Sequence, residues 1–420
     1  MSTHAGRRRL SAGELELVLT AHERFVTGKP GGKRASLRLV NLSGLDLSQR
    51  NLTDADFTGS VFDGARLIKT KLERANLFGC DLRGADMRAA NLRRADLRGV
   101  CLRGANLSMA DLTQADFREG QIAIAHPRKG LDTMRHESRA GEADNVNFSG
   151  ATLDGSQFNG SSAHKADFTD CSMRGTKLAG ANLKEANLTG ANLEGADVAG
   201  TNLEGANFSG AVLSGVNMDV ARVHGADLRG VLRDPDADMH RRIGELIKRA
   251  DGNEAWCQTG AKEGSPANFN GEDLRLFKDT LKGRRLTAMS AQNACLVGLD
   301  LSGCHLQGVN FEGADLRGVN FRGADLRGAR LIGANLTKAD LRQAVMSSLP
   351  LGGGRSAPAA LNHARLRYAL IQAVDATAAV FDQADLRGAD FTGAQVENAS
   401  WLGAHLDGTS GLAPGQGRAA

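Results

Sequence analysis

A five-residue repeat dominates this sequence and restricts what the chain can fold into. Residues 181–210 read ANLKE ANLTG ANLEG ADVAG TNLEG ANFSG, six blocks of five built on one rule. In each block a small residue is followed by Asn or Asp and then by an apolar residue, which we call the centre, and Gly often closes the block. A period of five matches neither the 3.6 residues of a helical turn nor the two of a flat strand. It fits a chain that turns a corner every five residues.

Each block therefore supplies one side of a coil. The centre and the small residue point inward from a short extended step, while Asn or Asp and the two residues after the centre form the outside and the turn. Gly suits a turn position with φ > 0, and Asn or Asp hydrogen-bonds the local backbone there. Four steps close a square coil of about 20 residues, and coils stack at roughly the 4.8 Å spacing of paired strands. The prediction is a solid prism whose core includes the centres Leu183, Leu188, Leu193, Leu203, Phe208, Leu316, Phe321 and Leu326.

With these A(D/N)LXX blocks the chain resembles the pentapeptide-repeat family. The resemblance implies an all-β solenoid, a right-handed quadrilateral β-helix, whereas the period alone indicates a coiled solenoid without its handedness. Known members of the family serve as topoisomerase-protecting DNA mimics, as assembly factors or as modules of unknown role. The resemblance is therefore specific for the fold and weak for function.

Composition adds few constraints. Lys and Arg number 52 against 48 Asp and Glu, and this small excess is a poor argument for nucleic acid as a partner. Cys80, Cys171 and Cys304 occupy small inward positions and no C-x-x-C pair occurs, which favours reduced structural cysteines. The sequence holds no apolar run of about 18 residues. We therefore expect a cytoplasmic bacterial protein without a membrane span.

The N-terminus predicts a cap on the first coil. Residues 1–10 are expected to be a disordered basic arm, and residues 11–36 a capping helix with its loop. Ser11 and Glu14 form the sequence of a capping box. Leu15 and Phe25 lie on the apolar stripe of this helix, which can cover a strand edge that would otherwise recruit other chains.

The first β-helix is predicted over residues 37–230, with an inserted loop at 123–145. Its centres run from Leu37 to Ile122 and resume at Phe148 in a register shifted by one, which a looped-out insertion permits. The loop is expected to be mobile or functional because of its length. Its basic residues make it a candidate docking element, whereas its two histidines lack the partners of a metal site. These basic residues are Arg128, Lys129 and Arg135.

A second cap and a second β-helix follow. Residues 231–268 return to helical spacing and repeat features of the N-terminus about 231 residues later, with Leu246 matching Leu15 and Trp256 matching Phe25 as an aromatic plug. We infer an internal duplication that gives two prisms, each preceded by its own cap. The second β-helix is predicted over residues 269–408, with Trp401 closing the last coil, and residues 409–420 as a flexible tail. The Gly-rich segment near Pro350 is expected to be a loosened coil rather than an excursion.

Five arginines one residue after successive centres form the densest outward positive charge. We call Arg83, Arg88, Arg93, Arg98 and Arg103 the Arg girdle. With four sides to a coil, they spread over all faces. The simplest interpretation is solvated surface, with Arg83 near Asp81 and Arg98 near Asp96, because exposed pairs of this kind contribute little energy. The alternative is an anion-binding surface.

The sequence predicts no catalysis, cofactor or metal. A prism packed with Leu and Phe offers no pocket for convergent polar groups, and the recurring Asp and Asn are explained by turn hydrogen bonds. The leading hypothesis is a rigid interaction scaffold for protein partners, with self-association through the end coils. One alternative, implied by the resemblance, is a gyrase-binding DNA mimic, although the net charge is +4. The other is binding of nucleic acid or an anionic surface through the Arg girdle; the scarcity of aromatic residues for stacking argues against single-stranded nucleic acid.

Overall fold

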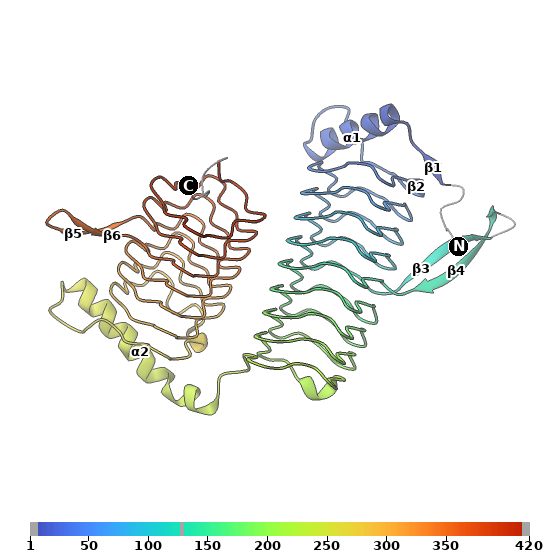
Figure 1. The fold of residues 1–420 in the computed structure, drawn as a ribbon. Helices are drawn as coiled ribbons and strands as arrows, with labels where there is room; N and C mark the ends of the chain where they lie inside the picture. Colours follow the sequence, from blue (N-terminus) through green and yellow to red (C-terminus); the bar gives the residue numbers. More distant parts are fainter. Residues whose placement is uncertain (1–6, 127–129, 414–420) are drawn as a thin grey trace. The chain divides into compact units, whose positions relative to one another are not determined.

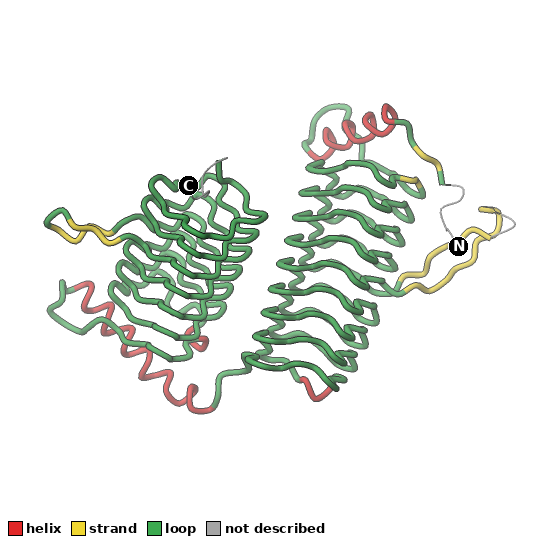
Figure 2. Tube along the Cα trace, in the orientation of Figure 1, coloured by secondary structure: helices red, strands yellow, loops and turns green. Residues whose placement is uncertain are grey.

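The computed structural model describes residues 7–126 and 130–413. The chain divides into two compact units, Met1–Asp234 and Pro235–Ala420, each of which is treated by itself. Each unit is a stack of four-sided coils that follows a helix (Figures 1 and 2). In the first unit the helix is α1 (Ala12–Val26), and in the second it is α2 (Ala237–Gln258). No helix in the described ranges is long and apolar enough to cross a membrane.

Parallel pairing between coils builds both stacks. The residue before each centre bridges the residue twenty positions on, as in Ser36 with Asp56 and Asp86 with Asn106. The N–H of each centre donates to the next coil, for example from Leu47 to the Arg66 carbonyl at 2.8 Å. The chain forms the right-handed quadrilateral β-helix that the family resemblance implies, with one bridge residue on each side of a coil.

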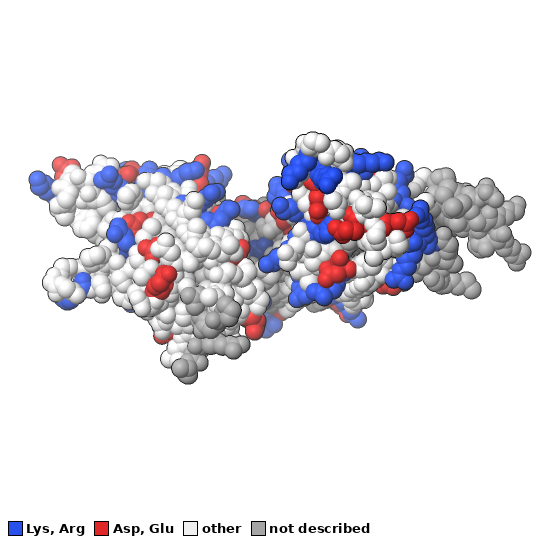
Figure 3. All heavy atoms as spheres, turned by 90° about the horizontal axis from the view of Figure 1, so that it is seen from above, with Lys and Arg blue, Asp and Glu red and all other residues white. Residues whose placement is uncertain are grey.

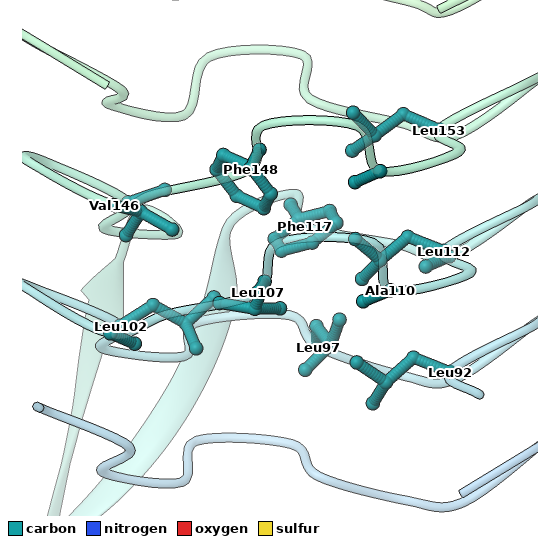
Figure 4. Packing of buried hydrophobic residues seen from close by; sticks show 14 of the residues in the cluster. Leu92, Leu97, Leu102, Leu107, Ala110, Leu112, Phe117, Val146, Phe148 and Leu153 are labelled. Carbon is teal, nitrogen blue, oxygen red and sulfur yellow. The ribbon is translucent and has the colours of Figure 1, made fainter. Parts of the chain in front are cut away.

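The centres fill the interior of each stack. Leu183, Leu188 and Leu193 have no exposed surface, and the other five centres named from the sequence are equally buried: Leu203, Phe208, Leu316, Phe321 and Leu326. Figure 4 shows centres of successive coils pointing into one continuous core. Burial of a Leu or Phe side chain contributes about 1.5–3 kcal/mol. The phenylalanines add stacked contacts, and the rings of Phe148 and Phe168 lie 4.9 Å apart.

A hairpin interrupts the first stack. It consists of β3 (Gly120–His126) and β4 (Gly130–Arg139), which pair antiparallel. Cys101 pairs with Glu142 rather than with a residue twenty positions on, so the excursion adds twenty-one residues. Twenty-one exceeds a multiple of five by one residue, and this explains why the register shifts by one. The predicted bounds were wrong: Ile122 is no centre because it lies in β3, and the coil resumes at Glu142.

A second hairpin leaves the other stack where the sequence predicts a loosened coil. It pairs β5 (Leu349–Gly352) with β6 (Arg355–Ala357). Arg330 bridges Ala360, thirty positions on, so ten residues are looped out. The prediction was wrong because ten residues equal two whole blocks, and the five-residue period therefore continues in phase across the excursion.

Short elements adjust the ends of both units. β1 (Arg8–Arg9) pairs parallel with β2 (Val40–Asn41). The prediction of a disordered arm over residues 1–10 was therefore wrong at these two positions. The reason is that the first coil has a strand edge with which they can form hydrogen bonds. The rest of that arm, residues 1–6, lies outside the described residues. Similarly, Ser410 bridges Asp390 and belongs to the last coil, not to the tail predicted for 409–420. Residues 414–420 are not described.

Two 3₁₀ turns complete the architecture. η1 (Met218–Val220) lies in the last coils of the first unit, and η2 (Arg275–Phe277) in the first coil of the second. Asn268 bridges Ser290, so this coil contains two residues more than the usual twenty. These two extra residues account for the irregular centre spacing in this part of the sequence.

Candidate interaction surface

The outward face carries a recurring side-chain pair that we call the Asp-x-Arg clasp. In the pair at 81 and 83, Nε of Arg83 donates to Oδ1 of Asp81 at 2.9 Å and Nη2 donates to Oδ2 at 2.6 Å. The same Oδ1 accepts the backbone N–H of Arg83 at 3.3 Å. The clasp therefore joins a turn hydrogen bond to a bidentate ion pair. It recurs in both units at 86/88, 96/98, 116/118, 227/229, 273/275, 315/317, 325/327, 340/342 and 385/387.

Every member of the Arg girdle has a carboxylate partner. Arg83, Arg88 and Arg98 form clasps, whereas Arg93 and Arg103 reach carboxylates of the next coil. Nη1 of Arg93 lies 3.0 Å from Asp111, and Nε of Arg103 lies 3.0 Å from Glu142. The hydrogen bond from Arg88 holds the pKa of Asp86 below its usual range. The girdle is thus a set of local ion pairs, and Figure 3 shows cationic and anionic side chains interspersed on the first unit.

The hairpin β3–β4 was the other candidate surface from the sequence. Arg128 and Lys129 lie outside the described residues, and Arg135 lies in β4 opposite Ile124. The base of the hairpin is fixed by Arg139, whose Nε donates to the Gly99 carbonyl at 2.6 Å and whose Nη2 donates to the Gly79 carbonyl at 3.0 Å. The sequence does not indicate this role, because the two carbonyls belong to residues 40 and 60 positions earlier in the chain.

The caps use different residues from those predicted as aromatic plugs. Leu15 and Leu246 are buried as expected, but Phe25 is 43% exposed and Trp256 is only partly buried. The plug prediction was wrong because the residues three positions earlier, His22 and Asn253, face the coil and are fully buried.

His22 and Asn253 occupy equivalent sites. Nδ1 of His22 accepts the backbone N–H of Ala35 at 3.0 Å, and Oδ1 of Asn253 accepts that of Ala267 at 3.0 Å. The next residue of each helix also pairs with an arginine of the coil. Glu23 lies 2.8 Å from Arg50, and Glu254 lies 3.7 Å from Arg284. These matching contacts support the inferred duplication.

At the other end of the second unit, Trp401 packs against the core. Its ring stacks on Phe381 at a centroid distance of 4.6 Å and meets Phe391 edge-on at 5.6 Å. The neighbouring Leu402 is 62% exposed. The last coil therefore presents an apolar side chain beside a coil edge.

Metal ligands and nucleophilic thiols are two kinds of chemical group that could form a site outside the clasps. The described part of the chain contains no group of three or more His, Cys, Asp or Glu side chains placed to hold a metal ion. The buried thiols are poor nucleophiles, since burial raises the pKa of Cys80 to about 12 and that of Cys304 to about 11. The Sγ atoms of Cys80 and Cys304 instead donate to the carbonyls of Phe57 and Leu281.

Comparison with known proteins gives one family. The family model described as "Pentapeptide repeats (8 copies)" matches more than half of the chain, over residues 41–78, 70–108, 80–119, 144–178, 166–205, 191–230, 294–331, 310–347 and 359–400. No curated protein matches the sequence.

Several solved structures are similar to parts of the chain. A pentapeptide repeat protein from the Arabidopsis thaliana thylakoid lumen is 28% identical with a TM-score of 0.19; the match covers 28% of this chain and 65% of that one. HetL from Nostoc sp. strain PCC 7120, involved in heterocyst differentiation regulation, is 21% identical over 95% of this chain and 96% of its own, with a TM-score of 0.16. Full-length QnrB1, a plasmid-mediated fluoroquinolone resistance protein, is 18% identical over 51% and 99%, with a TM-score of 0.21.

Proposed function

The chain belongs to the pentapeptide repeat family, and from this premise we propose that it is a non-catalytic, cytoplasmic scaffold that presents outward side chains to protein partners. The observation that carries the proposal is the fixed outer lattice of each stack. Coils repeat every twenty residues, and clasps hold the outward Asp and Arg side chains in defined positions. A surface whose side chains are already ordered loses little conformational entropy on binding. Rigid repeat stacks suit extended recognition surfaces for this reason.

Two alternatives receive less support. A gyrase-binding DNA mimic needs a continuous negative face, yet many outward carboxylates of this chain are neutralised by an arginine two residues later. Binding of nucleic acid through the Arg girdle needs accessible cations, yet every girdle arginine has a carboxylate partner. The ion pairs that weaken one alternative thus also weaken the other.

Self-association through the end coils forms part of the proposal. The last coil of the second unit places the exposed Leu402 beside a strand edge. Such an edge is a template for pairing with another chain. Size-exclusion chromatography with light scattering tests this part, and a Leu402→Asp variant should shift any dimer toward the monomer.

The experiment that tests the scaffold is affinity capture from a lysate of the source organism at low and moderate salt. It compares the intact chain with a variant lacking residues 120–140, which joins Glu119 to Gly141 and restores the spacing of twenty. A variant lacking residues 349–358 is the matched control, because it removes the other hairpin. We expect a stoichiometric protein partner that resists salt, and its loss only in the first variant would assign docking to β3–β4.

Two results would contradict the scaffold proposal. Recovery of nucleic acid alone, lost as salt rises, would favour the anion-binding alternative, since such binding depends steeply on salt. Recovery of a topoisomerase as the stoichiometric partner would favour the DNA mimic.

A further inference from the structure

Each capping helix is joined to the start of its first coil by one buried polar side chain, a contact that we call the clamp. The residue that forms the clamp differs between the two units. In both, a buried polar side chain of the helix accepts the backbone N–H at the start of the first coil: Ala35 for His22 and Ala267 for Asn253. Asn253 also satisfies its second polar group, because Nδ2 donates to the Thr287 carbonyl at 3.1 Å. Nδ2 also donates to Sγ of Cys257 at 3.5 Å, so both polar groups of Asn253 are satisfied, and the amide itself does not titrate.

His22 closes the clamp less completely. Since Nδ1 accepts a hydrogen bond, the neutral ring carries its proton on Nε2. The Thr53 carbonyl, in the position equivalent to Thr287, lies near enough to favour the protonated ring. Nevertheless, Nε2 is buried and forms no hydrogen bond of normal geometry with any described residue. The ring is held by one hydrogen bond and by stacking on Phe25 at 5.9 Å.

We propose that mild acid opens the cap of the first unit at His22, while the cap of the second unit, closed by Asn253, stays shut. Protonation would give the ring a second N–H, at Nδ1, and this N–H would point at the N–H of Ala35. Two donors cannot share that contact, so the charged ring must leave the clamp. The cap would then lose the hydrogen bond that joins α1 to the start of the first coil.

The charges around His22 do not reverse this expectation. Asp54 of the coil and Glu23 of α1 favour the charged ring, whereas Arg34 of the loop opposes it, and burial is the largest influence. Both carboxylates are already engaged, Asp54 by Arg74 at 2.8 Å and Glu23 by Arg50 at 2.8 Å. The net result is that the pKa of His22 is lowered from its usual value.

The lowered pKa of His22 determines how closure of the cap depends on pH. The folded cap binds the proton less readily than the opened cap, so closure is fully favoured above the ordinary histidine pKa of about 6.5 and is lost progressively as pH falls below it. Opening would release Leu15 and Leu19 from the core and uncover the edge of the first coil. An uncovered edge is available to pair with another strand. Opening of the cap in acid would therefore allow the first coil to associate with another chain.

Hydrogen exchange of the full chain, measured by mass spectrometry at pH 7.5 and 5.0, tests the proposal. After correction for intrinsic exchange, the opening constant of α1 should rise by up to roughly 30-fold at pH 5.0, the limit set by an ordinary histidine pKa. Peptides of α2 in the same sample provide the internal control and should change little.

Two reciprocal variants identify the residue. His22→Asn copies the second cap and should abolish the acid response of α1, whereas Asn253→His should confer one on α2. An unchanged α1 at pH 5.0, or an acid response retained in His22→Asn, would overturn the proposal. If His22→Asn does not fold, Asn253→His decides: acid opening of α2 supports the clamp, and its absence overturns it.

Discussion

At the scale of single residues, the small inward position accommodates polar atoms without cost to the core. Oγ of Ser60 donates to the Leu37 carbonyl at 2.6 Å, and Oγ1 of Thr70 donates to the Leu47 carbonyl at 2.9 Å. In each case the acceptor belongs to a centre of the preceding coil. A buried hydroxyl therefore finds a backbone partner wherever it occurs in this position, which explains why Ser, Thr and Cys replace Ala there.

The centre position is much less tolerant. Leu193 is fully buried, and Leu193→Ala should lower the free energy of unfolding of the first unit by about 2–5 kcal/mol, because the cavity cannot collapse within a stack of fixed coils. The adjacent Glu194 points outward, so Glu194→Ala should change it by less than about 0.5 kcal/mol. Denaturant unfolding followed by circular dichroism measures both. Equal losses in the two variants would contradict the inward assignment of the centre.

The clasp at 86/88 should titrate far from neutral pH. The hydrogen bond from Arg88 lowers the pKa of Asp86, so Arg88→Ala should return that pKa toward about 3.9, whereas Arg93→Ala, which removes a neighbouring cation with a different partner, should leave it low. Because the folded-state pKa is depressed, the clasp stabilises the fold above the ordinary carboxyl pKa and loses this contribution as pH falls below about 4. Carboxyl NMR titration measures the shift. An Asp86 midpoint unchanged by Arg88→Ala would show that the clasp does not hold its pKa down.

At the scale of elements, the length of an excursion decided whether the sequence could reveal it. The first hairpin shifts the register by one and so broke the pattern, although its strands begin before the pattern stops. The second is a multiple of five and left no trace in the period. The coils and the helix stripes followed from periodicity alone. His22, Asn253 and Arg139 did not, because their roles depend on contacts between segments that periodicity cannot place.

We therefore expect folding of the second unit to depend sharply on the length of a deletion at β5–β6. Removing residues 349–358 leaves a coil of twenty residues and should shift the Tm by less than about 4 °C, equivalent to about 1 kcal/mol. Removing residues 349–359 also deletes the inward Ala359. The coil is then one residue too short to close, and we expect the cooperative transition of the later coils to be lost. Thermal scans compare the two variants, and similar curves would refute the assignment of β5–β6 as a separable insertion.

At the scale of the whole molecule, each unit contains what a solenoid needs to fold. The buried core of the first unit runs from Leu15 to Met218 and that of the second from Met239 to Val396, and none of the described residues belongs to both. Each core begins at a capping helix. Stability in such stacks is approximately a sum of coil and interface terms, provided that the terminal coil is covered.

Residues 1–234 and 235–420 should therefore fold when they are expressed separately, each with one cooperative unfolding transition. The cap rather than the linker should be indispensable: a fragment of residues 261–420, which lacks α2, loses the contacts of the fully buried Leu246 and Asn253 and leaves the first coil with an open edge. We expect this fragment to aggregate or to unfold at a lower temperature than residues 235–420, because an unprotected strand edge recruits other chains. Light scattering and thermal unfolding at equal concentration compare them. If the fragment without α2 matched the capped one in both measurements, α2 would be a linker and the duplication of the cap would have no role in stability.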